Sequence, residues 1–228
     1  MNQAFLERLH QYVSARNLLS HPFYQDWREG KLTLNDLRSY ASQYYHFEAS
    51  FPRFLSAVRS RCPDPAVRQS ILSNLWDEEH GEQNHRALWL SFCAGLGLTP
   101  QEVMQAPVHP NTQALLDTYN TICSTRSFQE GLAAIYAYEV QVPEVAAETL
   151  VGLRERYGII DENALSFFQV HGYLDEEHSR VEGEAISEHT DENEEPAVES
   201  ALRAGLDAWW GFLDGVNELR LKSVATAT

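Results

Sequence analysis

The stretch ALRAGLDAWWGFLDGVNELR, residues 201–220, carries large apolar side chains at helical spacing. They are Leu202, Leu206, Trp209, Trp210 and Leu213. Side chains three or four positions apart share one face of a helix, so this stretch predicts an amphipathic helix. The same spacing recurs along nearly the whole chain, and the alternating patterns of β-strands are scarce. We therefore predict an all-α protein.

Several of the predicted helices are long enough to span a whole domain. They cover residues 34–61, 127–157, 161–189 and 196–220, and Pro52 predicts a bend in the first. Helices near or beyond twenty residues are typical of a bundle. No change in composition divides the chain, so we expect a single helical domain over residues 1–228.

Charge and composition narrow the classes of partner. Lys and Arg number 17 against 33 Asp and Glu, which argues against nucleic acid. No run of about 18 apolar residues is present, and the first residues lack a targeting pattern, so we expect a cytoplasmic protein without a membrane anchor. The three cysteines, Cys62, Cys93 and Cys123, lack the spacing of a zinc site and are expected to be buried thiols.

Three clusters carry side chains that bind metals. In WDEEHGEQNH (76–85), Glu78 and His85 are seven residues apart, almost two helical turns, and would face the same way on one helix. In HGYLDEEH (171–178), His171, Asp175 and His178 form one helical stripe. A solvated, charge-paired surface is the alternative interpretation of each cluster.

The third cluster is AIYAYEVQVPEVAAE (134–148), where Glu139 ends an apolar run. A buried carboxylate there is costly unless it is paired or binds a cation. Pro143 lacks the amide that would bond to the carbonyl of Glu139, so the helix should bend at this residue. An exposed glutamate beside an ordinary proline kink is the alternative.

Together the clusters supply three carboxylates and three imidazoles from three parts of the chain. Two metal ions need about this many ligands, and the residue types suit iron or manganese better than structural zinc. Three ligands for each ion leave open positions for dioxygen or substrate. A hydrolytic dimetal site stays open, because spacing alone does not identify the metal.

The segments HPFYQDWREGKL, YASQYYHFEASFPRFLSAV, DEEHGEQNH, YAYEVQVPEVAAE and HGYLDEEH resemble the heme-oxygenase-like diiron oxidases. The similarity extends to the branch that contains the chlamydial protein associated with death domains, which makes 4-aminobenzoate for folate. The resemblance implies a heme-oxygenase-like bundle of seven to eight helices and two iron ions, Fe/Fe or Mn/Fe. It implies as metal ligands Glu78, His85, Glu139, His171, Asp175 and His178.

The same resemblance implies chemistry on a tyrosine of the protein itself. Tyr24 matches the tyrosine that supplies the aromatic ring, and Tyr40 and Tyr138 match other tyrosines near the site. One position departs from the family: Thr149 stands where a lysine implicated in catalysis or amine donation is expected. The chain has only two lysines, Lys31 and Lys222. It also lacks a nucleotide or flavin fingerprint, so dioxygen reduction would need an external reductant.

Four alternatives remain at the level of sequence. An oxidase of this architecture would act on an exogenous amino acid or fatty acid. A metal-free hydrolase related to TenA would need a nucleophilic cysteine such as Cys123, and a heme protein would need His10 or His21 as axial ligand. An interaction protein without catalysis has no supporting motif. The sequence leaves the oligomeric state open, a homodimer included.

Overall fold

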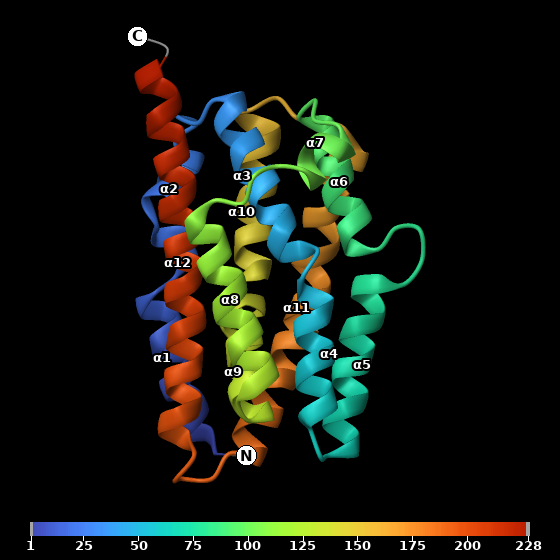
Figure 1. Ribbon diagram of the computed structural model, residues 1–228, viewed down its shortest axis with the longest axis vertical. Coiled ribbons are helices and arrows are strands. Elements are labelled where there is room, and N and C mark those ends of the chain that lie inside the picture. Colours follow the sequence, from blue (N-terminus) through green and yellow to red (C-terminus); the bar gives the residue numbers. More distant parts are fainter. Residues whose placement is uncertain (1, 227–228) are drawn as a thin grey trace.

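Helices make up almost all of this computed structural model (Figure 1). The structure describes residues 2–226, except for the side chains of residues 173, 174, 176 and 222–226. The elements are α1 (Gln3–Ala15), the short 3-10 helix η1 (Leu18–Ser20), α2 (Pro22–Arg28), α3 (Leu34–Glu48), α4 (Phe51–Arg61), α5 (Pro65–Glu79), α6 (His85–Gly95), α7 (Pro100–Met104), α8 (Pro110–Thr125), α9 (Phe128–Glu139), α10 (Val142–Glu155), α11 (Glu162–His189) and α12 (Glu195–Thr226).

The predicted all-α class is confirmed, but the predicted number of seven to eight helices is wrong. The described residues form more, from α1 to α12, because prolines divide two of the long predicted helices. Pro52 and Pro143 each lack the amide that would continue the helix, and α3 ends at Glu48 and α9 at Glu139, four residues earlier in each case. The predicted bends at these prolines are therefore complete breaks.

Helix α9 forms the centre of the bundle. All of its side chains except that of Glu130 are buried, as expected for a helix that is covered on every side. It packs against α8, α11 and α12, and α11 also packs against α6 and α10. The longest helix, α12, runs the height of the molecule in Figure 1. The buried apolar side chains of the described residues form one core cluster.

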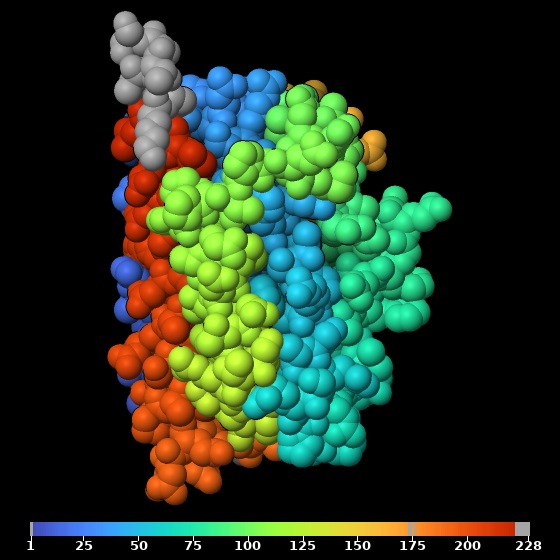
Figure 2. Space-filling view, in the orientation of Figure 1, coloured from blue at the N-terminus to red at the C-terminus, as the bar shows by residue number. Residues whose placement is uncertain are grey.

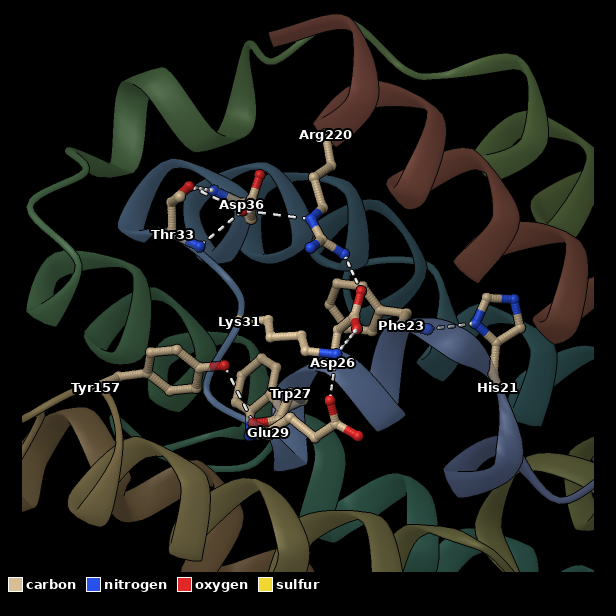
Figure 3. Close-up of polar contacts among 10 residues, drawn as sticks. All are labelled: His21, Phe23, Asp26, Trp27, Glu29, Lys31, Thr33, Asp36, Tyr157 and Arg220. Carbon is tan, nitrogen blue, oxygen red and sulfur yellow. Dashed lines mark hydrogen bonds and ion pairs between the residues drawn. The ribbon is translucent and has the colours of Figure 1, made fainter. Parts of the chain in front are cut away.

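Helix α2 is held in place by polar contacts to two other parts of the chain (Figure 3). Arg220 of α12 pairs with Asp26 of α2. The hydroxyl of Tyr157, after α10, donates a hydrogen bond of 3.1 Å to the carbonyl oxygen of Trp27. Tyr24 lies on the same short helix, so these contacts also fix the position of its ring.

Two expectations about the whole chain can be compared with the structure. Cys62, Cys93 and Cys123 are buried and unpaired, as predicted. Within the described residues, no helix combines the length and apolarity that crossing a bilayer requires.

Candidate metal centre and tyrosine cavity

The first group of predicted ligands is Glu78, His85 and His171, whose candidate ligand atoms lie within 4.8 Å of one another. All three side chains are buried. Nδ1 of His85 lies 2.8 Å from Oε1 of Glu78, and the His85 and His171 ring centroids are 4.2 Å apart. Three helices, α5, α6 and α11, therefore deliver one carboxylate and two imidazoles to one point.

Glu78 and His85 meet in a different way from the one the spacing suggested. They do not lie on one helix, because α5 ends at Glu79 and α6 begins at His85. Gly81 between them has φ of 79°, a left-handed conformation that favours glycine. The side chain of Asn84 then accepts a hydrogen bond from the Ala87 amide and caps α6. A turn, and not a shared helical face, brings the pair together.

The second group is Glu139, Asp175 and His178, whose candidate ligand atoms also lie within 4.8 Å of one another. Glu139 is the last residue of α9, and the other two lie on one stripe of α11, as predicted. Nδ1 of His178 is 3.6 Å from Oδ1 of Asp175. The structure thus brings all six predicted ligand side chains into two adjacent groups of three.

Neighbouring groups orient several of these side chains. The ring Nδ1 of His171 lies 2.7 Å from the carbonyl oxygen of Phe167, which leaves Nε2 for another partner. Nε2 of His178 lies 3.2 Å from Oδ2 of Asp77, which leaves Nδ1. Asn74 donates a hydrogen bond of 2.9 Å to Oε1 of Glu139. Metal-binding histidines and carboxylates are typically held by such contacts from their other side.

Three carboxylate oxygens of the two groups, Glu78 Oε2, Glu139 Oε2 and Asp175 Oδ2, are buried without a hydrogen-bond partner among the described residues. The buried Nδ1 atoms of His85 and His178 face only the carboxylates of their own groups, Glu78 and Asp175. Buried polar atoms are almost always bonded to protein, water or an ion. These unpartnered atoms occur in both groups, so the residues fit two bound cations.

The carboxylates repel one another strongly. Burial, followed by the charges of Glu139 and Asp175, raises the pKa of Glu78 well above its usual range. Burial and then the charge of Asp175 raise the pKa of Glu139 to about 7. A divalent cation between the two groups would offset both the repulsion and the loss of solvation.

The two α11 histidines are shifted in opposite directions. Burial lowers the pKa of His171 to about 4, so its imidazole is neutral at neutral pH and its lone pair is available to a metal ion. Burial also disfavours charged His178, but the carboxylate of Asp175, 3.6 Å away, and the charge of Glu139 outweigh it and raise the pKa to about 9. A cation at the second group would displace that proton.

The predicted tyrosines lie together in a second buried region. The hydroxyl oxygens of Tyr24 and Tyr40 are 3.1 Å apart, and the hydroxyls of Tyr44 and Tyr138 are hydrogen-bonded to each other. All four border a cavity of about 30 Å³. Its lining is otherwise apolar and comprises Leu18, Trp89, Val142, Val145, Ala146, Phe167, Phe168, Trp209, Phe212 and Leu213. Phe167 stacks on His171 with ring centroids 3.9 Å apart, so the cavity wall touches the first ligand group.

A family model for iron-containing redox enzymes matches residues 38–210. The chain belongs to this family. A domain from Shewanella denitrificans that is described as having a heme oxygenase-like fold superposes with a TM-score of 0.76 at 19% identity, covering 95% of this chain and 92% of that one. The predicted heme oxygenase-like fold is therefore confirmed.

Relatives of this iron-containing redox enzyme include proteins named 4-aminobenzoate synthase. The one from Nitrosomonas europaea is 42% identical over 224 residues, which is 94% of this chain and 91% of the relative. The one from Chlamydia trachomatis is 36% identical over 210 residues, which is 92% and 90% of the two chains. The resemblance inferred from sequence motifs is therefore confirmed over nearly the whole chain.

The residues of two alternative functions lie in unsuitable surroundings. Burial raises the pKa of the Cys123 thiol to about 12, which opposes the thiolate that a TenA-like hydrolase would need. His21, the candidate heme ligand, is buried, accepts a hydrogen bond from the Phe23 amide and lies 3.1 Å from Asp214. The other candidate, His10, is hydrogen-bonded to Tyr136.

The sequence analysis did not single out three buried residues near the ligand groups or the tyrosine cavity. Glu182 is buried and interacts with Glu139, and its signal was its place on the α11 stripe, four residues after His178. Glu48 is buried as well, and its signal was a proline four residues later, as for Glu139. Tyr44 follows Tyr40 by one helical turn.

Thr149 is buried, and its hydroxyl oxygen has no hydrogen-bond partner. Of the two lysines, Lys31 is more than half exposed and pairs with Glu29 (Figure 3). The side chain of Lys222 lies outside the described residues. No lysine is therefore seen at the tyrosine cavity among the described side chains.

Proposed function

We propose that this chain is an oxygen-dependent dinuclear iron oxidase that forms 4-aminobenzoate, with the ring supplied by its own Tyr24. The observation that carries the proposal is that a cavity bordered by four tyrosines touches the first of the two groups of ligand-type side chains through Phe167. Relatives named 4-aminobenzoate synthase, similar over nearly the whole chain, supply the reaction.

Each group of three would hold one iron ion. Glu78, His85 and His171 form the first site, and Glu139, Asp175 and His178 form the second. The charge of Glu139 raises the pKa of Glu78 more than any other charge does, so this carboxylate of the second group would lie within the field of both ions. Reduced iron supplies the chemistry of dioxygen reduction, and its electrons come from an external reductant.

The size of the cavity favours an internal ring over an exogenous substrate. A space of about 30 Å³ is far below the roughly 300–1,000 Å³ of sites for small organic ligands. An exogenous amino acid or fatty acid would not fit there unless the lining moved. Tyr24 already places a phenol in this space.

Removing an electron from a phenol makes its proton strongly acidic, so Tyr24 needs a proton acceptor. Burial outweighs the hydrogen bond from Tyr40 and raises the pKa of Tyr24 to about 12, so the ring is a neutral phenol before the reaction. A neutral phenol is a poor base, so Tyr40, whose hydroxyl is 3.1 Å away, would orient the Tyr24 hydroxyl and could accept its proton only by passing its own proton on. The aromatic rings around the pair exclude water and limit side reactions.

The experiment follows the mass of the peptide that contains Tyr24. Protein reconstituted anaerobically with ferrous iron is exposed to dioxygen with a reductant, digested and analysed beside an unexposed sample. We expect Tyr24 to lose its ring in proportion to the 4-aminobenzoate formed, and Tyr45, buried but outside the cavity, to stay intact. Product formed while Tyr24 stays intact would establish the exogenous-substrate alternative instead.

A further inference from the structure

Glu48 is a buried carboxylate that forms no ion pair with the described residues. It is the last residue of α3 and is 3% exposed. Its Oε1 atom has no hydrogen-bond partner, and no ion pair within the described residues includes Glu48. Burying a carboxylate without a compensating partner is costly, so such groups are almost always paired or bound to a cation.

Other buried polar side chains of the same helix contrast with Glu48. The amide of Gln43 donates to the Pro107 carbonyl oxygen at 2.9 Å, and its oxygen accepts from the amide of His109 at 2.9 Å and the hydroxyl of Thr112 at 2.8 Å. Gln43 therefore has a complete structural role. Glu48 has no such role, which points to a partner from outside the chain.

The surroundings of Glu48 show where that partner lies. A cavity of about 140 Å³ is bordered by Glu48 and Glu78, with Glu79, Asn84 and Arg86 nearer the α5–α6 loop. That loop stands out from the side of the bundle (Figures 1 and 2). Glu78 has an unpartnered Oε2 atom of its own. Two buried carboxylates with vacant acceptor atoms thus share one small space.

The charges acting on Glu48 come from both ligand groups. Its pKa is raised well above the usual range, first by burial and then by Glu78, while His85 lowers it. These neighbours belong to the first group, and Asp175 of the second adds a weaker repulsion. The charged group that acts most strongly on Glu48 is therefore another carboxylate, that of Glu78. A cation between the two would attract both and offset their repulsion.

Glu48 and Glu139 also occupy equivalent positions in their helices. Each ends a helix, and each is followed four residues later by a proline, Pro52 or Pro143. Glu139 belongs to the second group of ligand-type side chains. In both cases a helix that ends four residues before a proline places a carboxylate beside a group of ligand-type side chains.

We propose that Glu48 is a further carboxylate ligand of the cation held by Glu78, His85 and His171. The inference rests on the proposed metal centre. It gives the first ion two carboxylates and two imidazoles, and it makes the carboxylate contribution of the two sites alike. It also places this carboxylate one helical turn from Tyr44, whose hydroxyl is hydrogen-bonded to Tyr138.

The test is anaerobic calorimetric titration with ferrous iron of wild type, Glu48→Gln and the matched control Glu79→Gln. Glu79 borders the same cavity but is exposed. We expect two ions in wild type and in the control, and in Glu48→Gln one ion bound normally and the other at least about tenfold more weakly. Two ions bound with wild-type affinity by Glu48→Gln would overturn the assignment of Glu48 alone. Failure of wild type to bind two ions would overturn the proposed metal centre.

Thermal unfolding without metal supplies an independent readout. Because the described residues offer Glu48 no ion-pair partner, the unfolding temperature of metal-free Glu48→Gln should equal or exceed that of wild type, and the increase on adding iron should be smaller. A lower unfolding temperature of the metal-free variant would show a structural partner and overturn the proposal. Should Glu48→Gln not fold, Glu48→Asp replaces it, and undiminished affinity for both ions would count against the proposal equally.

Discussion

His171 is joined to Phe167 in two ways. The rings stack with centroids 3.9 Å apart, and Nδ1 of His171 lies 2.7 Å from the carbonyl oxygen of Phe167. Phe167 also borders the cavity that contains Tyr24. One residue of α11 therefore orients a proposed metal ligand and forms the wall of the tyrosine cavity, which gives the two regions a shared structural support.

The hydrogen bond from Asn74 to Glu139 predicts an effect on metal affinity. Asn74→Ala removes the donor that holds Oε1 of Glu139, and losing such a supporting contact typically weakens metal binding about 10- to 100-fold. Titration with Mn²⁺ should show this weakening for one of the two ions. The control is Ser73→Ala, an exposed neighbour that borders the same cavity as Asn74. Equal affinities in the two variants would argue against this role.

The raised pKa of His178 predicts how the stability of the metal-free protein depends on pH. The folded-state value is about 9 and the ordinary value is 6.5. Folded protein holds this proton more tightly, so the resulting stability is fully present below about pH 6.5 and is lost as pH rises to about 9. We expect the unfolding temperature to fall across this range, and to fall less in His178→Gln. Parallel curves for the two proteins would contradict the prediction.

Close packing between α10 and α2 predicts a sensitive position beside the tyrosine cavity. A Cβ atom on Gly152 would lie 2.2 Å from Nε1 of Trp27, so Gly152→Ala must displace the indole ring. Overpacking of this kind costs about 1–3 kcal/mol, and denaturant unfolding should show it. Gly211→Ala in α12 is the control, since nothing lies within 4 Å of its added atom. Wild-type stability of Gly152→Ala would mean that the contact relaxes freely.

Local periodicity explains why so much of the site could be predicted from sequence. His171, Asp175 and His178 share a stripe of one helix, and that relationship depends only on helical geometry. The pairing of Glu78 with His85 was predicted for an incorrect reason, because the turn at Gly81 depends on how α6 packs. The two side chains do meet, but along a different backbone path.

Residues whose role depends on burial by distant helices were not predictable in the same way. Glu48 lies on a helix rich in aromatic residues, and only the packing of α3 near α5 and α6 shows that it is enclosed beside Glu78. Tyr44 had no feature that set it apart from Tyr45, its neighbour, until the structure paired it with Tyr138. Which of these residues lies at the site depends on tertiary contacts, and no local sequence pattern encodes those contacts.

The presence of Thr149 where a lysine is expected leads to a prediction about the source of the amino nitrogen in 4-aminobenzoate. A threonine side chain has none to give, and Lys31 is paired with Glu29 at the surface. We therefore expect the amino group to come from a small amine in solution. Reaction of unlabelled protein in ¹⁵N-ammonium should give labelled 4-aminobenzoate, and uniformly ¹⁵N-labelled protein in unlabelled ammonium should give a product whose amino group is unlabelled. The reverse pattern would show that the protein donates the nitrogen.

The most direct measurement is anomalous X-ray diffraction at the iron edge from crystals loaded anaerobically with ferrous iron. We expect two iron peaks, one among Glu78, His85 and His171 and one among Glu139, Asp175 and His178. A single peak, or iron bound away from these six side chains, would contradict it.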